Sequence, residues 1–249
     1  MNKELQAVKD LLNQLRLTSV RANLEDILTS SVDLTPLQFL EKTLRLEADA
    51  RQSNSRLRRL KQANFPYHQT IDDFDFGFQT SVSARHIRHL MDMTWVEQAF
   101  NLIFVGPPGA GKTHLAVGLG IQAVELGYSV CFTTMDELIR DLKTEQISSR
   151  SKRRLNHLRS AALVIIDELG FLPVTSSEAN LFFQLVNSLY LHTSVIITSN
   201  KGFEDWPQYF GDPIITTAIL DRLCHKSELF NMSGDSYRLA NRNTIFPAK

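Results

Sequence analysis

An eight-residue glycine-rich run, GPPGAGKT, begins at Gly106 and constrains the fold of this chain more than any other feature. The run fits the pattern GxxxxGK[ST] at every specified position. Apolar residues 102–105 come directly before it, and the amphipathic residues 112–126 follow it. The order of strand, loop and helix predicts an anion-binding loop, because the glycines let backbone N–H groups curl round a phosphate at the positive end of a helix dipole. A chance glycine-rich turn would lack this strand and helix.

The chemistry of such a loop assigns roles to its polar residues. Lys112 is expected to reach the β- and γ-phosphates of a nucleotide, and Thr113 to ligate Mg²⁺. ATP and Mg²⁺ are therefore the predicted cofactors. We expect the whole loop to contact the nucleotide, namely Gly106, Pro107, Pro108, Gly109, Ala110, Gly111, Lys112 and Thr113.

Apolar segments rich in valine and isoleucine alternate with helical patterns over the second half of the chain. The expected strands are residues 102–105, 130–133, 163–167, 195–199 and 228–232. The expected helices are residues 112–126, 135–143, 178–191 and 216–223, with a further helix ending near Phe100. This alternation predicts an α/β fold, a phosphate-loop core whose five-stranded, mostly parallel sheet is covered by helices on both faces.

The N-terminal part of the chain has a different pattern. Leucines and valines repeat at three- and four-residue spacing over residues 4–63, a stretch without glycine, which predicts a small bundle of about three helices. Thr35 and Pro36 are typical of an N-cap followed by proline at the first helical position. Residues 64–66, Asn-Phe-Pro, interrupt the pattern. The expected division is a helical N-terminal domain, residues 1–66, and an ATPase domain, residues 67–249.

Composition narrows the class of protein. The formal net charge is zero, so total charge favours no class of partner. The two cysteines, Cys131 and Cys224, lack CxxC spacing, which disfavours a zinc site and a disulfide framework. Cys131 lies in an apolar run and is expected to be buried. The polar start of the chain and the lack of any apolar run of membrane-spanning length predict a cytoplasmic location without a membrane partner.

Two carboxylates follow the apolar strand 163–166. Ligands of open α/β sheets bind at the carboxyl ends of the strands, where Asp167 and Glu168 are expected to lie. Asp167 is placed to hold Mg²⁺ through water, and Glu168 to polarise the attacking water. Paired acids are weakly specific alone, but here they follow a phosphate-binding loop after one intervening strand. Glu168 favours a hydrolase over a protein that only binds nucleotide.

Two further polar residues have competing interpretations. Asn200 ends the apolar strand 195–199 and is expected either to orient water beside the γ-phosphate or to supply ordinary turn chemistry. Arg222, within the helical residues 216–223, is either a surface ion-pair partner or a finger that enters a neighbouring subunit's ATP site.

The order of these motifs resembles that of an AAA+ ATPase. The runs VIIDELG from Val164, ITSN from Ile197 and ILDRL from Ile219 resemble the IstB-like helper ATPases of insertion sequences, which are related to the helicase loader DnaC and the initiator DnaA. The resemblance covers about residues 70–245. It implies that Asn200 is the first sensor and Arg222 the trans-acting finger, with Arg238 the nearest candidate for a second sensor. A C-terminal lid is expected to be absent or vestigial.

The resemblance also implies partners. The family assists a DDE-type transposase, assembles on double-stranded DNA as a homo-oligomer, and uses ATP to control target selection. Such an oligomer would carry its ATP sites at subunit interfaces, and DNA would stimulate its Mg²⁺-dependent ATPase activity.

Basic residues gather in two clusters that favour DNA phosphates, although such clusters are commonly only solvated faces. The first cluster comprises Arg51, Arg56, Arg58, Arg59 and Lys61. The second comprises Arg150, Lys152, Arg153, Arg154 and Arg159. No base-reading helix-turn-helix pattern stands out, so we expect weak sequence specificity.

Three other functions compete with this interpretation. A replicative helicase loader of the DnaC type shares the ATPase core and would differ in its N-terminal part. A protein unfoldase usually carries an aromatic-hydrophobic-glycine pore loop after the second strand, where this chain reads TMDEL from Thr134. A DNA scaffold that binds ATP without turnover would not need Glu168.

Overall fold

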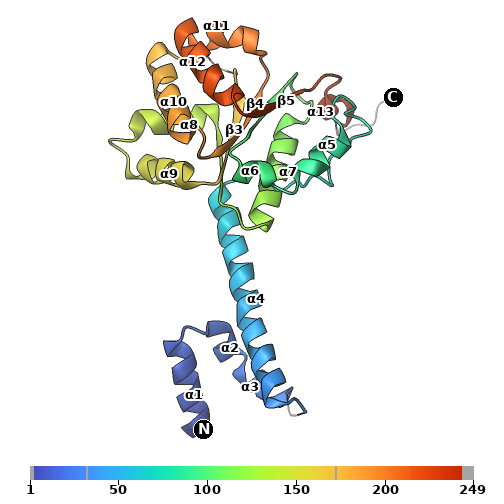
Figure 1. Cartoon of the computed structure of the whole chain (residues 1–249), viewed down its shortest axis with the longest axis vertical. Helices are drawn as coiled ribbons and strands as arrows, with labels where there is room; N and C mark the ends of the chain where they lie inside the picture. Colours follow the sequence, from blue (N-terminus) through green and yellow to red (C-terminus); the bar gives the residue numbers. More distant parts are fainter. Residues whose placement is uncertain (1–2, 32, 172, 243–249) are drawn as a thin grey trace. The chain divides into compact units, whose positions relative to one another are not determined.

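The structure is a computed structural model and describes residues 3–31, 33–171 and 173–242 (Figure 1). The chain forms two compact units, Met1–Arg58 and Arg59–Lys249. The sequence pattern places the boundary after residue 66, whereas the structural division falls inside helix α4, Pro36–Ala63. This helix continues through the first basic cluster and ends where Asn64 adopts a left-handed φ of 59°. Asparagine tolerates that conformation after a helix, which explains why the pattern breaks there.

The N-terminal unit is helical, as predicted. Its helices are α1 (Lys3–Gln14), α2 (Thr18–Ala22), α3 (Leu24–Thr29) and the first part of α4. The predicted cap of α4 is confirmed: the Gln38 N–H donates to Thr35 Oγ1 at 3.4 Å, and the Thr35 N–H donates to Gln38 Oε1 at 2.9 Å. This reciprocal pair satisfies two backbone donors that the helix start would otherwise leave open.

The second unit contains the predicted five-stranded sheet, and all four of its strand pairings are parallel. The strand order is β2-β3-β4-β1-β5. The strands are β1 (Asn101–Val105), β2 (Val130–Thr134), β3 (Leu163–Leu169), β4 (Ser194–Ser199) and β5 (Ser227–Asn231). Each overlaps one of the expected strands with its bounds shifted by at most two residues, so the prediction of the sheet is confirmed.

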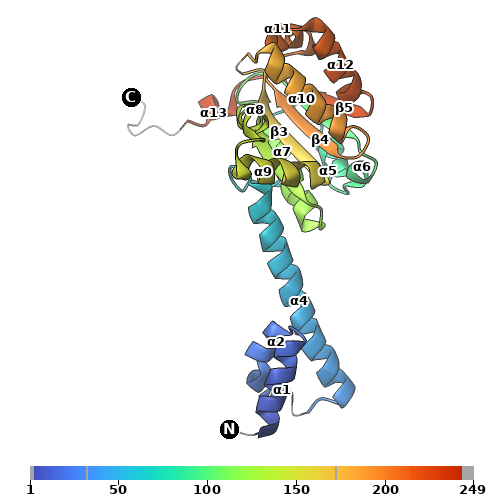
Figure 2. The same ribbon diagram turned by 90° about the vertical axis from the view of Figure 1, so that its left-hand side faces the viewer.

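Helices cover both faces of the sheet. Alternate strand residues enter two separate core clusters: Leu102 and Phe104 of β1 pack on one side, and Ile103 packs on the other. Helices α8 to α12 cover the second side, and α5, α6 and α7 the first (Figures 1 and 2). Cys131 belongs to the second cluster, as expected for a buried residue, and burial raises the pKa of its thiol to about 12. The helices are α5 (Ala84–Leu90), α6 (Thr94–Glu97), α7 (Lys112–Glu125), α8 (Met135–Thr144), α9 (Ser149–Ser160), α10 (Ser176–Leu189), α11 (Trp206–Phe210), α12 (Pro213–Cys224) and α13 (Tyr237–Ala240).

One predicted helix is wrong. Instead of a single helix ending near Phe100, the chain forms α5 and α6, separated by Met93 at a left-handed φ of 60°. The Asp92 carboxylate accepts hydrogen bonds from both the N–H and the hydroxyl of Thr94, and this local turn restarts the helix.

Among the described residues no helix is both long and apolar enough to cross a membrane.

Candidate functional site

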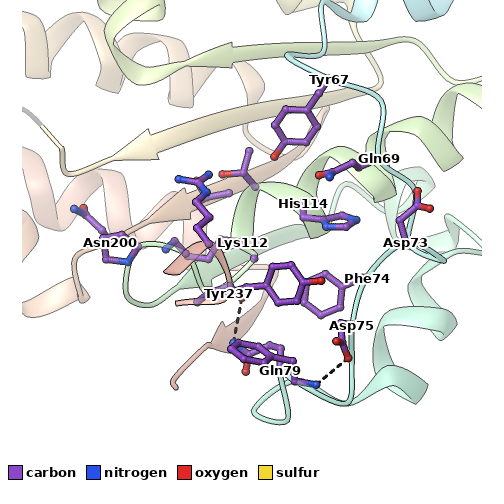
Figure 3. A pocket seen from close by; sticks show the side chains of 18 of the residues that line it. Tyr67, Gln69, Asp73, Phe74, Asp75, Gln79, Lys112, His114, Asn200 and Tyr237 are labelled. Atoms are coloured by element: carbon purple, nitrogen blue, oxygen red, sulfur yellow. Dashed lines mark hydrogen bonds between the residues drawn. The ribbon is translucent and has the colours of Figure 1, made fainter. Parts of the chain in front are cut away.

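A cavity of about 610 Å³ lies at the carboxyl ends of β3 and β4, beside the glycine-rich loop (Figure 3). Its walls come from this loop, from the ends of the two strands, from residues 67–79 and from the start of α13. Ligand pockets usually measure about 300–1,000 Å³, so the space suits a nucleotide. Side chains remote in the sequence therefore meet where a parallel sheet presents its ligands.

The glycine-rich loop has the geometry of a phosphate cradle. Gly109 and Gly111 have φ angles of +82° and +93°, which residues with a Cβ rarely adopt. Lys112 is only 8% exposed, and its Nζ donates to the carbonyls of Gly106 at 2.6 Å and Pro107 at 2.8 Å. Burial lowers the pKa of Lys112, Asp167 works in the opposite direction, and Arg238 lowers it further. The lysine is thus held across the loop with its charge next to the cavity.

The two acids differ in their surroundings. Asp167 is 4% exposed, and its Oδ1 accepts from Thr113 Oγ1 at 2.9 Å and from Thr198 Oγ1 at 2.5 Å. Glu168 is exposed and lines the cavity. A buried carboxylate next to a threonine hydroxyl offers the hard oxygen ligands that Mg²⁺ prefers. The second acid remains available to a water molecule in the cavity.

Asn200 also lines the cavity. Its Oδ1 is buried and has no hydrogen-bond partner among the described residues. A buried carbonyl oxygen without a partner is uncommon and calls for an explanation. A water molecule or ligand in the cavity would supply the missing donor, which favours the functional interpretation of this residue over ordinary turn chemistry.

The two candidate arginines lie in different places. Arg238, on α13, lines the cavity, and the chain beside it reaches the loop through the Tyr237 N–H, which donates to the Gly109 carbonyl at 3.1 Å. Arg222 does not line the cavity of its own chain. Its Nε donates to Asn187 Oδ1 at 2.9 Å, and its guanidinium lies 4.7 Å from the centre of the Phe183 ring. The structure thus brings Arg238 to the phosphate loop and leaves Arg222 on the surface formed by α10 and α12.

Aromatic side chains form one wall of the cavity, which the sequence pattern did not predict. Figure 3 shows Tyr67, Phe74 and Tyr237 facing the same cavity as Lys112. The Phe74 ring packs edge-on to His114 at 5.2 Å, and the Phe78 ring packs edge-on to Tyr237 at the same distance. The run of phenylalanines after residue 73 was a visible signal, but nothing in its spacing showed that it would fold across the loop.

The first basic cluster lies wholly on α4. Within it, Arg51 is not free: its Nε donates to Glu47 Oε1 at 2.9 Å, and its Nη2 donates to the Arg16 carbonyl at 2.8 Å. Burial acts to raise the pKa of Glu47, but the Val20 N–H and Arg51 outweigh it, so the pKa lies below its usual value. Arg51 therefore has a structural partner inside the N-terminal unit.

The second basic cluster lies on α9 and divides in two. Arg154 pairs with Glu137 at 2.9 Å and with Asp141 at 3.2 Å, and Arg159 pairs with Glu145 at 2.5 Å. The three remaining residues of the cluster are exposed to solvent: Arg150, Lys152 and Arg153. Within this cluster, these three are the residues for which the described part of the chain shows no ion pair, so their positive charge faces solvent.

The chain is similar to known proteins over most of its length. Residues 10–244 match the family described as IstB-like ATP binding protein. An ATP-binding protein of insertion sequence IS21 from Pseudomonas aeruginosa is 42% identical over 93% of this chain and 88% of its own length. Another, of insertion sequence IS5376 from Geobacillus stearothermophilus, is 37% identical over 86% of this chain and 85% of its own length.

Solved structures resemble about 70% of the chain. DnaA from Aquifex aeolicus, bound to AMPPCP, superposes with a TM-score of 0.56 at 20% identity, over 69% of this chain and 52% of that one. The DnaC helicase loader gives 0.52 at 21% identity, over 70% of this chain and 98% of that one. At this identity the likeness concerns the fold alone, and it confirms the predicted AAA+ architecture.

Proposed function

This chain belongs to the family of IstB-like ATP-binding proteins, and from that premise we propose that it is an ATPase that oligomerises on duplex DNA and serves the transposase of an insertion sequence. The family and the fold make it an ATP-binding AAA+ protein. We propose in addition that the protein hydrolyses ATP with Mg²⁺, binds duplex DNA and acts with a transposase. The observation that supports hydrolysis is that Lys112 and Glu168 line one cavity, whose lining residue Thr113 donates to Asp167.

The residues of the cavity fit both ATP and Mg²⁺. The positive-φ glycines leave room for phosphate oxygens beside backbone N–H groups, and the buried Lys112 brings a positive charge to them. Thr113 and Asp167 would hold Mg²⁺, which supplies charge neutralisation at the phosphates. Glu168 would polarise the attacking water, and the unsatisfied Asn200 amide oxygen would accept a hydrogen bond from it.

Arg222 supports an oligomeric site. It lies outside the lining of the cavity of its own chain and contacts Asn187 and Phe183 instead of the phosphate loop. Its guanidinium rests over Phe183, which keeps the charged group at the surface of the α10 and α12 pair. An arginine held there would offset transition-state charge in the cavity of a neighbouring subunit. ATP binding would then control assembly.

DNA binding is proposed for the exposed part of α9. Arg150, Lys152 and Arg153 would contact phosphates, which gives affinity with little sequence preference and a strong salt dependence. The paired residues Arg154 and Arg159 would fix the position of α9 rather than contact DNA. The first cluster, on α4, is a second candidate surface for the same phosphate chemistry.

Glu168→Gln separates binding from hydrolysis. The amide keeps the shape of the side chain but cannot act as a base, so we expect normal ATP affinity, loss of turnover and longer-lived oligomers on duplex DNA. The measurements are ATPase rate, affinity for a fluorescent ATP analogue, and mass of the DNA complex. Glu204→Gln, an exposed glutamate outside the cavity lining, is the matched control. Normal turnover by Glu168→Gln would remove this residue from the catalytic role.

A helicase loader is the second candidate, because the DnaC structure is covered almost completely by this fold. The relatives with the higher identity are named for insertion sequences, which favours the transposase. Binding of the purified chain to the transposase of an insertion sequence, measured against binding to a replicative helicase of the same host, distinguishes the two. Preference for the helicase would overturn the proposed partner.

A further inference from the structure

Strand β3 contains a bulge at the two acids of the site. Its pairing with β4 runs regularly to Ile166 opposite Ile197 and resumes at Leu169 opposite Ser199. Two β3 residues, Asp167 and Glu168, therefore lie opposite a single β4 residue, Thr198. Two residues opposing one is the defining feature of a β-bulge, and bulges commonly redirect side chains next to active sites.

The bulge explains how Glu168 reaches the cavity while its neighbour Asp167 contacts Thr113 of the cavity lining. Side chains that follow each other in a regular strand point to opposite faces of the sheet. Here Glu168 has a left-handed φ of 63°, which turns the chain after Asp167. Asp167 stays buried against Thr113, and Glu168 enters the cavity lining. A left-handed conformation is strained for a glutamate, so it persists only where the surroundings hold it.

Thr198 supplies a contact that holds this conformation. A bulge interrupts the backbone ladder, and the N–H of Glu168 donates to Thr198 Oγ1 at 3.0 Å. The same hydroxyl donates to Asp167 Oδ1 at 2.5 Å. A hydroxyl has one proton and two acceptor lone pairs, so the two bonds are compatible. Thr198 is 1% exposed, which protects both bonds from competition with water.

We propose that Thr198 is a positioning residue for ATP hydrolysis, whose hydroxyl fixes the Glu168 backbone and the Asp167 carboxylate together. The proposal rests on the hydrolytic function inferred above. Thr198 stands two residues before Asn200, so the same strand end carries the third polar group of the site. The strand residues before it, Ile196 and Ile197, are apolar and belong to the two core clusters, which anchors the hydroxyl in a rigid element.

The test compares variants that keep or remove the hydroxyl. Thr198→Val has nearly the same shape without the hydroxyl, Thr198→Ala is smaller, and Thr198→Ser restores the hydroxyl. Thr193→Val is the matched control, because Thr193 is also a buried threonine and stands beside the other end of β4. Turnover number, affinity for a fluorescent ATP analogue with Mg²⁺, and melting temperature are measured for each purified full-length variant.

We expect Thr198→Val to lower the turnover number about ten- to hundredfold, as for loss of a hydrogen bond to a charged group. Its nucleotide affinity should stay within about threefold of the wild-type value, since the phosphate loop is intact. Thr198→Ser should restore turnover, and Thr193→Val should turn over normally even if its melting temperature falls. That split between turnover and affinity is not expected from a residue that only stabilises the fold.

Two results would overturn the proposal. The first is normal turnover by either hydroxyl-free variant that still binds nucleotide. The second is a defect in Thr198→Ser as large as that in Thr198→Val. If Thr198→Val does not fold, Thr198→Ala and Thr198→Ser carry the comparison. Absence of hydrolysis by the wild-type protein, with and without duplex DNA, would instead refute the proposed function itself.

Discussion

Replacing Gly111 with alanine should destabilise the phosphate loop in two ways, through backbone strain and through a steric clash. Gly111 has a φ of +93°, and a Cβ built there would lie 2.5 Å from the Cε2 atom of Phe74. Gly127 has a φ of +100°, but a Cβ there meets nothing within 4 Å. Both substitutions strain the backbone, and only the first also produces a clash. Gly127→Ala is thus a matched control for Gly111→Ala.

The expected magnitudes follow from these contacts. A left-handed alanine costs about 1–2 kcal/mol, and the reduced entropy of the unfolded chain offsets about 0.4–1 kcal/mol of that. Gly127→Ala should therefore lower the free energy of unfolding by about 1 kcal/mol. Overpacking adds about 1–3 kcal/mol at Gly111, for a total of about 2–4 kcal/mol. The Phe74 ring cannot move freely, because it packs between Phe76 and His114.

Urea unfolding gives the two free energies, and titration with a fluorescent ATP analogue reports the site. Gly111→Ala should also lose nucleotide affinity, whereas Gly127→Ala should bind normally. Adding Phe74→Leu should recover part of the stability lost by Gly111→Ala, because a smaller side chain relieves the clash. Equal destabilisation by the two alanine variants, or no recovery in the double variant, would refute the contact between the loop and the aromatic wall.

Five other substitutions follow from the contacts of the site and of helices α9, α10 and α12. Lys112→Ala should abolish ATP binding, and unchanged affinity would contradict the assignment of the loop. Arg222→Ala mixed with Lys112→Ala should recover part of the ATPase activity if the arginine acts in trans, whereas action in cis predicts none. Arg153→Ala should weaken binding to duplex DNA and reduce by about 1 the slope of the logarithm of the binding constant against the logarithm of the salt concentration. Arg154→Ala should mainly lower the melting temperature, because it leaves Glu137 and Asp141 without their partner. Lys143 Nζ donates to Glu178 Oε1 at 2.7 Å, and this bond, together with those from Thr175, lowers the pKa of Glu178 to about 2. The stability that ionised Glu178 adds should therefore be present above its usual pKa of 4.5 and lost as the pH falls toward 2. The measurement is the difference in unfolding free energy between the wild-type protein and Glu178→Gln as a function of pH.

Much of the fold was predictable because its signals are local. The apolar strands, the N-cap at Thr35 and the phosphate loop each depend on a few consecutive residues whose periodicity, capping chemistry or backbone freedom is visible in the sequence. The helix expected to end near Phe100 failed for a local reason as well, since a left-handed Met93 divides it. Left-handed conformations of residues other than glycine leave little trace in a sequence.

The sequence by itself identified the candidate residues for the chemistry of this protein: the loop lysine, the paired acids and the strand-end asparagine. Only the tertiary structure decided which groups surround them. Phe74 packs beside Gly111, and Thr198 forms hydrogen bonds with both acids at the bulge. Arg154 forms ion pairs with carboxylates of α8, whereas Arg153 is exposed to solvent. Each of these depends on a contact between elements far apart in the chain, and short-range patterns carry no information about such contacts.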